Sequence, residues 1–261
     1  MELPVNRLKR NLREGRAQIG LWSQLTSPTG VEVLAGAGFD FLVLDTEHAP
    51  NELPMVLGQL RALTGGTASG VVRAAWNDPV LFKRLLDVGA QSLLVPFVQD
   101  ADDARRAVAA MRYPPHGIRG VAAATRASAY GRVKDYLARA HDELCLLVQI
   151  ETRVALGNLE RIAAVEGVDG LFIGPSDLAA DMGHIGASGH AEVRAAIDDA
   201  IRRIRATGKV AGILAPVEAD ARHWLDLGCL FLAVGSDVGL LARQGEALAA
   251  KFKPKATAER G

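Results

Sequence analysis

This chain of 261 residues contains few cysteines and few aromatic residues, and it has no excess of positive or negative charge. Its two cysteines, Cys145 and Cys229, lie inside apolar segments without the spacing of metal ligands, so neither a disulfide framework nor a cysteine-based metal site is indicated. Thirty basic residues balance thirty acidic ones, and aromatic residues make up 5%. Because nucleic-acid binders need a basic surface and aromatic side chains for base stacking, the composition predicts no nucleic-acid partner.

Long hydrophobic segments and common cofactor motifs are missing as well. The apolar runs are short and broken by Gly, Pro or charge, which predicts no membrane span, and the N-terminus lacks the apolar core of a signal peptide. G-x-G-x-x-G does not follow the first apolar run, and neither G-x-x-x-x-G-K-[ST] nor G-x-S-x-G occurs. We therefore expect a cytoplasmic globular protein that uses no organic cofactor and is not a serine hydrolase.

What the chain does contain is one unit repeated along its length: a short apolar run, a polar or Gly/Pro break, and an amphipathic segment. The apolar runs are rich in Val, Ile, Leu and Phe, and their length suits strands that are buried on both faces. They cover residues 18–22, 41–45, 70–73, 92–95, 145–150, 170–173, 210–214 and 231–234. Helix-like segments between them include residues 79–88, 101–111, 192–206 and 218–227.

This alternation predicts an α/β protein with a single (β/α)8 TIM barrel over residues 1–261, in which 253–261 form a frayed tail. An open doubly wound sheet is the alternative, but the dinucleotide motif expected in it is absent. The first and last expected helices, residues 28–37 and 238–251, would close the ring or be exchanged with a neighbouring subunit. Residues 112–142 lack a regular pattern, and so long a loop is more often functional than idle.

Polar side chains follow five of the predicted strands, at the barrel end where TIM-barrel enzymes place their chemistry. Since the carboxyl ends of parallel strands meet at one rim, these groups are expected to converge. They are Asp45, Thr46, Glu47 and His48; Arg73; Gln149 and Glu151; Ser176 and Asp177 of the segment Gly174-Pro175-Ser176-Asp177; and Ser236 and Asp237.

Two of these carboxylates, Glu151 and Asp177, are candidates for a metal site. Gln149 and Glu151 are two positions apart and point to the same side of a strand, and Asp177 follows the next strand. Two carboxylates with water and a chelating substrate are a common way to bind Mg²⁺ or Mn²⁺. The alternative is that Glu151 is a surface carboxylate and Asp177 a helix N-cap.

His48, Asp45 and Arg73 are candidates for acid–base and charge-stabilising roles. Asp45 precedes His48 by three residues, and a carboxylate bonded to one ring nitrogen would make the other a better base near neutral pH. Arg73 ends a buried strand and needs an anionic partner, because a buried guanidinium keeps its charge. It would form a structural ion pair with Asp45 or Glu47, clamp a carboxylate or enolate, or do both.

Lysine is absent from the ends of all the predicted strands, which disfavours a Schiff-base mechanism. A divalent metal, a His–carboxylate base and an arginine remain. That set suits proton abstraction next to a carbonyl, with the metal stabilising the enolate.

At this point the motifs resemble those of a known family, the HpcH/HpaI class II pyruvate aldolases, and within it the 4-hydroxy-2-oxoheptanedioate aldolase branch. The likeness runs from about Leu8 to Phe252. It is carried by Leu44-Asp45-Thr46-Glu47-His48-Ala49-Pro50, Trp76-Asn77-Asp78-Pro79, Leu85-Leu86-Asp87-Val88-Gly89-Ala90, Tyr113-Pro114-Pro115-His116-Gly117-Ile118-Arg119-Gly120, Val148-Gln149-Ile150-Glu151-Thr152 and Gly170-Leu171-Phe172-Ile173-Gly174-Pro175-Ser176-Asp177-Leu178.

The resemblance implies a metal-dependent aldolase that reversibly cleaves 4-hydroxy-2-oxo acids to pyruvate, or a close 2-oxo acid such as hydroxypyruvate, plus an aldehyde, in aromatic compound catabolism. By position, Glu151 and Asp177 would ligate Mg²⁺, Mn²⁺ or Co²⁺. Main-chain amides after the sixth strand would receive the carboxylate of the 2-oxo acid. The substrate-binding residues implied are Gln149, Gly174, Pro175, Ser176, Asp177 and Leu214.

The resemblance also implies the catalytic residues and the assembly. His48, oriented by Asp45, would be the acid–base group, and Arg73 would stabilise the enolate and the aldehyde oxygen. Asp87 would reach the site of a neighbouring subunit in a homohexamer whose last helix is exchanged between protomers.

Recognition of the aldehyde is where the chain departs from the family pattern. The stretch 120–132 is shorter than in the dicarboxylate-cleaving relatives, and Ala215-Pro216 differs as well, so the sequence does not fix the aldehyde. Two alternatives stay open. One is a citrate-lyase-like carbon–carbon lyase on a CoA thioester, which would need a basic cluster for the CoA phosphates. The other is a barrel that binds 2-oxo acids without catalysis.

Overall fold

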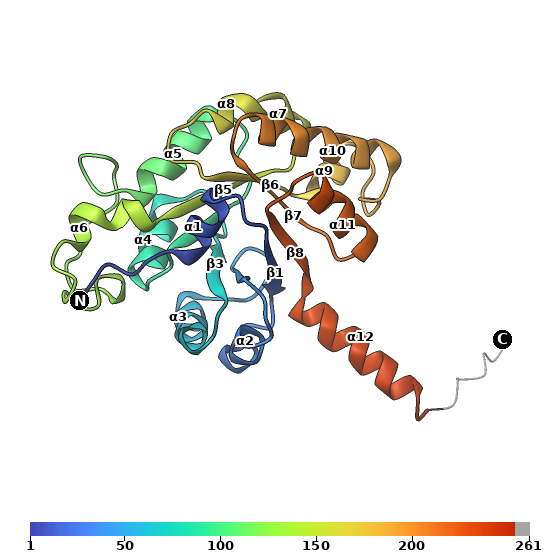
Figure 1. Ribbon diagram of the computed structural model, residues 1–261, viewed down its shortest axis with the longest axis horizontal. Helices are drawn as coiled ribbons and strands as arrows, with labels where there is room; N and C mark the ends of the chain where they lie inside the picture. Colours follow the sequence, from blue (N-terminus) through green and yellow to red (C-terminus); the bar gives the residue numbers. More distant parts are fainter. Residues whose placement is uncertain (254–261) are drawn as a thin grey trace.

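The computed structural model describes residues 1–253 and shows a closed barrel of parallel strands in sequence order (Figure 1). This confirms the predicted (β/α)8 fold. The frayed tail predicted for 253–261 lies outside the described residues except for Lys253. The strands are β1 (Gln18–Ser23), β2 (Phe41–Asp45), β3 (Ser69–Arg73), β4 (Ser92–Val95), β5 (Cys145–Ile150), β6 (Gly170–Ile173), β7 (Val210–Leu214) and β8 (Phe231–Ser236).

Helices surround the barrel, and several begin where the sequence carries a capping residue followed by proline. Ser27 Oγ accepts a hydrogen bond from Gly30 N, and Asp78 Oδ1 accepts from Val80 N and Leu81 N. The helices are α1 (Arg7–Arg13), α2 (Pro28–Ala35), α3 (Leu53–Ala62), α4 (Pro79–Asp87), α5 (Ala101–Met111), α6 (Tyr136–Arg139), α7 (Arg153–Gly157), α8 (Leu159–Ala163), α9 (Pro175–Asp181), α10 (Ala191–Ala206), α11 (Glu218–Asp226) and α12 (Asp237–Ala250).

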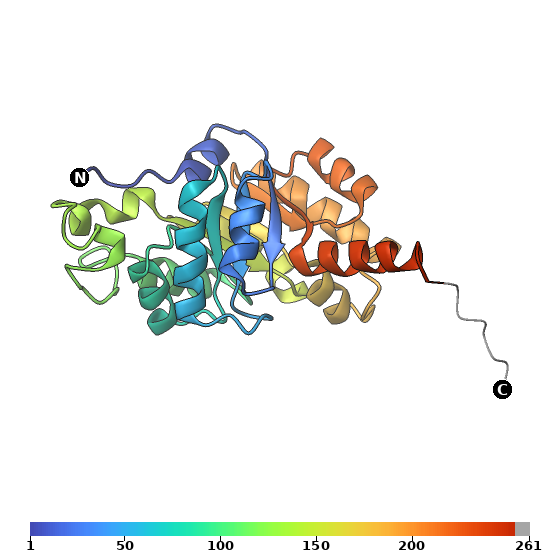
Figure 2. The same ribbon diagram turned by 90° about the horizontal axis from the view of Figure 1, so that it is seen from below.

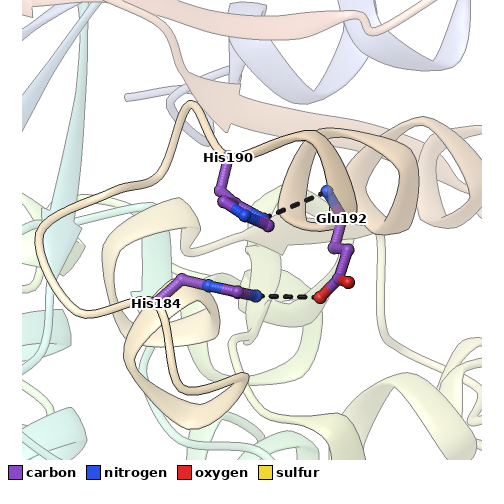
Figure 3. Close-up of side chains that lie close together, drawn as sticks. All are labelled: His184, His190 and Glu192. Atoms are coloured by element: carbon purple, nitrogen blue, oxygen red, sulfur yellow. Dashed lines mark hydrogen bonds and ion pairs between the residues drawn. The ribbon is translucent and has the colours of Figure 1, made fainter.

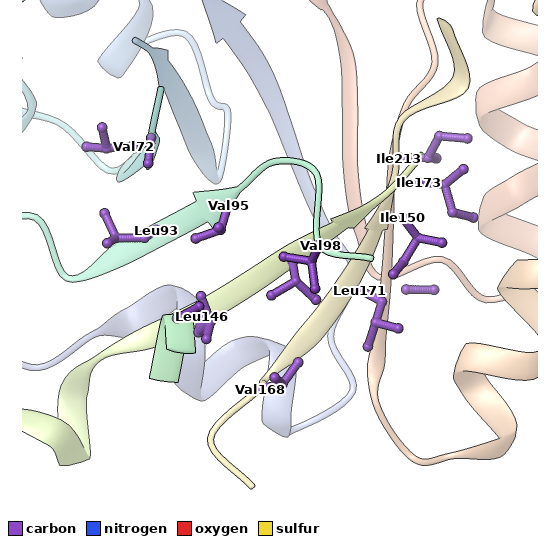
Figure 4. Close-up of a cluster of buried hydrophobic side chains, with 14 of the residues drawn as sticks. Val72, Leu93, Val95, Val98, Leu146, Ile150, Val168, Leu171, Ile173 and Ile213 are labelled. Carbon is purple, nitrogen blue, oxygen red and sulfur yellow. The ribbon is translucent and has the colours of Figure 1, made fainter. Parts of the chain in front are cut away.

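Two layers of apolar side chains pack on the two faces of the barrel wall. The outer layer lies between strands and helices and includes Val72, Leu93, Leu146 and Ile173 (Figure 4). The inner layer fills the lumen. Its members are Leu8, Leu12, Trp22, Phe41, Val43, Val71, Leu94, Cys145, Leu147, Phe172, Val210, Phe231 and Ala233.

The period of two along each strand connects this lumen to the rim. Phe41 and Val43 are followed at the same spacing by Asp45, and Val71 is followed by Arg73. Cys145 and Leu147 lead in the same way to Gln149 and Glu151. The rows of side chains that fill the barrel therefore become polar at the carboxyl ends of the strands.

The last helix, α12, extends away from the barrel (Figures 1 and 2). Asp237 is its only buried residue, while Leu240, Leu241 and Leu248 are exposed. An apolar helix face without intramolecular cover suits contact with another subunit. Exchange of this helix between subunits stays a prediction.

Candidate functional site

A cavity of about 390 Å³ opens at the carboxyl ends of the strands. Of the eleven residues predicted to bind the metal or the substrate or to act in catalysis, all but Asp45 and Asp87 line it. Two larger cavities, of about 610 and 520 Å³, are lined by none of these eleven. The lining residues are Trp22, Gln24, His48, Arg73, Gln149, Glu151, Phe172, Gly174, Pro175, Ser176, Asp177, Leu214, Pro216, Gly235 and Ser236. We call this space the rim cavity.

Arg73 lines the rim cavity, and the fully buried Asp45 holds it from behind. The two residues are register partners on β2 and β3, and Arg73 donates from Nε to Asp45 Oδ1 at 2.9 Å and from Nη2 to Oδ2 at 2.6 Å. Trp22 Nε1 and Gln24 Nε2 also donate to Asp45 Oδ2. Burial favours the neutral acid, but the hydrogen bonds and charge of Arg73 outweigh it and hold the pKa of Asp45 below its usual value. Asp45 is therefore a fixed anion that orients Arg73.

Glu47 is a second carboxylate on the same guanidinium. Arg73 Nη1 lies 3.0 Å from Glu47 Oε2, in an ion pair whose geometry is not that of a hydrogen bond. Burial, together with the charges of Asp45 and Asp177, outweighs the attraction of Arg73 and raises the pKa of Glu47 to about 7. The sequence offered Glu47 only as a possible partner of Arg73, and the structure supports that pairing.

Glu151 is nearly inaccessible to solvent and holds both of its oxygens in place. Phe97 N donates to Oε1 at 2.6 Å, and Gln149 Nε2 donates to Oε2 at 2.6 Å. Gly174 is needed beside it, because a Cβ at that position would lie 2.5 Å from Glu151 Oε2. Burial, with the charges of Asp177 and Glu47, raises the pKa of Glu151 to about 7 despite these hydrogen bonds. The alternative interpretation of Glu151 as a surface carboxylate is therefore wrong, because the residue is buried.

The donor set around Glu151 fits a hard divalent cation. Within residues 1–253, Glu151 and Asp177 form no ion pair with a Lys, Arg or His side chain, and the buried Gln149 Oε1 accepts no hydrogen bond. Asp177 lies in the first turn of α9, whose N-cap is Gly174, so Asp177 does not cap the helix. Uncompensated carboxylate and amide oxygens at one place are typical of Mg²⁺ or Mn²⁺ sites.

His48 lies at the mouth of the rim cavity with 60% of its side chain exposed. Asp45 accepts from the main-chain N–H of His48 at 3.3 Å and from that of Glu47 at 3.0 Å. The carboxylate nearest to the His48 ring is that of Glu47, 4.0 Å from Nε2. Among the described contacts Asp45 thus orients the His48 backbone rather than its ring, because its oxygens already accept from Arg73, Trp22 and Gln24.

Asp87 lies outside the rim cavity of its own chain. It ends α4, where Arg119 Nη2 donates to its Oδ1 at 2.6 Å, and the buried Arg119 guanidinium stacks 4.4 Å from the Tyr113 ring centroid. The structure therefore does not join Asp87 to the other predicted site residues within one protomer. Its role at a neighbouring site stays a prediction.

Some residues in or beside the rim cavity escaped the sequence-based reasoning. Trp22 has no ionisable group that would mark it in the sequence, although it follows the lumen row to the rim. The main-chain N–H of Phe97, held at φ 51°, has no sequence signal beyond its place after β4. Asp237, in contrast, is expected at the rim from the sequence but does not line the cavity. It accepts from Ser23 Oγ and Gln24 N and so ties β1 to the start of α12.

Comparison with known proteins agrees with the geometry of the rim cavity. Residues 18–244 match the model of the HpcH/HpaI aldolase/citrate lyase family, and the chain belongs to that family. A protein named pyruvate aldolase from Rhizobium etli is 59% identical over 252 residues, which cover 97% of this chain and 99% of the relative. A protein named 4-hydroxy-2-oxo-heptane-1,7-dioate aldolase from Klebsiella pneumoniae is 59% identical over 253 residues, covering 97% and 96%.

Solved structures give the same result for the fold. The crystal structure of an HpcH/HpaI aldolase/citrate lyase family protein from Burkholderia cenocepacia superposes with a TM-score of 0.92 at 39% identity, covering 95% of this chain and 99% of that one. The predicted family is thereby confirmed. Among the helices described for residues 1–253, none has the length and apolar character needed to cross a membrane.

Proposed function

We propose that the chain is a divalent-metal-dependent aldolase that reversibly cleaves 4-hydroxy-2-oxo acids to pyruvate, or a close 2-oxo acid, plus an aldehyde. The class, a carbon–carbon lyase of the aldehyde-lyase type, is the one predicted from the sequence and is borne out by the names of the relatives at 58–59% identity. The single observation that carries the metal-dependent mechanism is the buried Glu151 carboxylate, which lines the cavity with Asp177 and Gln149 and, among residues 1–253, pairs with no Lys, Arg or His side chain.

Glu151 and Asp177 would hold the metal, with Gln149 beside it. A bound divalent cation supplies a Lewis acid that polarises the keto oxygen of a 2-oxo acid and lowers the energy of its enolate. Main-chain amides of Gly174–Asp177 at the start of α9 would receive the substrate carboxylate. Leu214 and Phe172 supply an apolar part of the cavity wall.

The proton and the negative charge would be handled by His48 and Arg73. A base removes the proton from the 4-hydroxyl group, the C3–C4 bond breaks, the aldehyde forms, and a proton then returns to C3 of the enolate to give pyruvate. His48 is the group at the mouth of the cavity that can move this proton. Arg73 is held by Asp45 and Glu47, so its charge is in place before the bond breaks.

A cleavage assay tests this function. Purified enzyme with Mg²⁺ or Mn²⁺ should release pyruvate from a racemic 4-hydroxy-2-oxo acid, detected with a coupled lactate dehydrogenase reaction, and excess chelator should abolish the release. His48→Ala should lower the rate of pyruvate release and leave the metal affinity nearly unchanged. An unchanged rate of pyruvate release in excess chelator would contradict the proposal.

The two alternatives are less well supported by the rim cavity. A CoA thioester would need cations for its phosphates. Among residues 1–253, Arg73 is the only Lys or Arg that lines the cavity, and its guanidinium is already paired with Asp45 and Glu47. A barrel that only binds 2-oxo acids would not require a fixed arginine and an exposed histidine over the same carboxylates. Such a protein would show no turnover in the cleavage assay.

We also propose that the protein is a homohexamer in which α12 packs on a neighbouring subunit. Leu241 and Leu248 on this helix are 64% and 58% exposed in the single chain, so the helix has an apolar face to cover. Leu241→Asp should lower the mass measured by light scattering from six times 27.7 kDa to that of smaller species. Arg243→Ala, on the same helix but at a solvated ion pair with Glu246, should leave the mass unchanged. A Leu241→Asp protein of wild-type mass would show that α12 does not hold subunits together.

A further inference from the structure

A second group of metal-ligating side chains lies away from the rim cavity, between α9 and α10. His184, His190 and Glu192 each offer one ligand atom, and the three atoms lie within 4.8 Å of one another (Figure 3). His184 Nε2 is 2.9 Å from Glu192 Oε2. The two imidazole rings stack with their centroids 3.7 Å apart and their planes at 17°. None of the three residues lines the rim cavity.

The loop between the two helices folds so that the rings meet. Gly183 follows α9 with φ 86°, in the left-handed region that glycine adopts without strain. Three main-chain hydrogen bonds then turn the chain back: His184 N to Ala179 O at 2.7 Å, Ala187 N to His184 O at 2.9 Å, and His190 N to Ala187 O at 2.9 Å. The two histidines are thus brought together by backbone structure and not by chance contact of side chains.

The other half of the cluster is anchored to a long helix. His190 is the N-cap of α10, where its Nδ1 accepts from Glu192 N at a long 3.3 Å. Asn, Asp, Ser and Thr are the usual N-caps, so an imidazole at this position is unusual. Glu192 lies in the first turn of this 16-residue helix, where the dipole favours a carboxylate. Its oxygen is therefore held beside both rings.

Two imidazoles and one carboxylate form a ligand set that differs from that of the rim cavity. Three protein ligands of this kind with water at the fourth position are typical of zinc, whereas oxygen donors alone suit Mg²⁺ and Mn²⁺. We propose that His184, His190 and Glu192 form a zinc site that ties the α9–α10 loop to the first turn of α10.

This zinc site would hold the α9–α10 loop and take no part in the cleavage reaction. It lies at the opposite end of α9 from Asp177, so it anchors the helix that carries one rim carboxylate without touching the reacting atoms. Two variants separate it from the rim cavity. His190→Asn removes an imidazole but keeps a side chain that caps α10 well, and His184→Ala removes the other imidazole without touching the cap.

Calorimetric titration of the full chain with Zn²⁺ in excess Mg²⁺, compared between the wild type and the two variants, tests the proposal. The wild type should bind one equivalent that His190→Asn and His184→Ala lose or bind at least about 10-fold more weakly. Zinc should also raise the melting temperature of the wild type and not of the variants. Turnover with Mg²⁺ should be unchanged in both variants.

The chain offers a matched control in a second histidine pair. His116 and His141 have ring centroids 5.3 Å apart, and Asp142 lies 3.5 Å from His141. Within residues 1–253, however, the ligand atoms of these three side chains do not come as close together as those of His184, His190 and Glu192. His141→Ala should bind zinc like the wild type. Equal zinc affinity and stoichiometry in the wild type and in His190→Asn would place the zinc elsewhere and overturn the proposal. Should His184→Ala fail to fold, His190→Asn decides the outcome.

Discussion

Glu151→Gln is expected to bind Mn²⁺ more than about 100-fold more weakly and to lose about 10³-fold in turnover. The variant keeps the size of the side chain and an acceptor for Phe97 N, but it removes the charge that a divalent cation needs. Metal affinity is measured by titration with Mn²⁺ followed by electron paramagnetic resonance, and turnover by release of pyruvate. Wild-type metal affinity in this variant would remove Glu151 from the ligand set.

The fold of the Glu151→Gln variant should be intact. The pKa of the Glu151 carboxyl group is raised to about 7 in the folded protein, against 4.5 in a model compound. Because the unfolded chain loses this proton at a lower pH, the group lowers the free energy of unfolding as the pH rises through that interval. In chelator at pH 8 the variant is therefore expected to melt at the same temperature as the wild type or above it. A lower melting temperature would mean that Glu151 supports the fold.

Asp177→Asn and Asp181→Asn form a matched pair on the same short helix. Asp177 lines the rim cavity, while Asp181 lies at the end of α9 and accepts from Arg153 at the surface. Only the first substitution should weaken metal binding and turnover. Equal effects of both would point to damage to α9 and not to loss of a ligand.

Arg73→Ala is expected to have two effects of similar size. It leaves Asp45 and Glu47 buried without their cation, which should lower the free energy of unfolding by about 3–5 kcal/mol. It also removes the fixed positive charge from the cavity, which should lower kcat by about 10²–10³-fold at saturating substrate. Unfolding is followed in urea, and kcat is measured below the lowered melting temperature.

Arg73→Lys separates the two effects. Lysine restores a positive charge to the carboxylates but cannot make the two parallel bonds to Asp45, so stability should recover further than kcat. Arg153→Ala, which removes an exposed arginine paired with Asp181, should change stability by less than about 1 kcal/mol and leave kcat unchanged. Wild-type kcat in Arg73→Lys would make Arg73 a purely structural residue.

The barrel and most of its rim could be predicted because their signals are local. The strands carry short apolar runs, and β2, β4, β5, β6 and β7 have the predicted bounds. Gln149 and Glu151 share a face by the period of two, and Asp45, Arg73 and Asp177 reach the rim because parallel strands end there. The first helix, α1, was not predicted, although Asn6 caps it and Leu8 and Leu12 close the lumen, because seven residues rich in charge carry little pattern.

The sequence could not predict which hydrogen-bond or ion-pair partner a side chain selects when several are within reach. Asp-x-x-His gives no sign that Asp45 binds Arg73 with both oxygens and meets His48 only through its main-chain N–H. Nor does it show that Glu47 is the carboxylate closest to the His48 ring. The hydrogen bond from Phe97 N to Glu151 joins residues 54 positions apart, and a backbone donor has no side-chain signature.

Proton exchange into pyruvate tests the central claim most directly, because it needs no knowledge of the aldehyde. Pyruvate in D₂O is followed by proton nuclear magnetic resonance with the enzyme and Mg²⁺, and again with excess chelator. We expect the methyl signal to fade with Mg²⁺ and to persist with chelator, and to persist in both with Glu151→Gln. Exchange that continues in chelator, or that Glu151→Gln leaves at the wild-type rate, would contradict metal-dependent enolisation at Glu151 and Asp177.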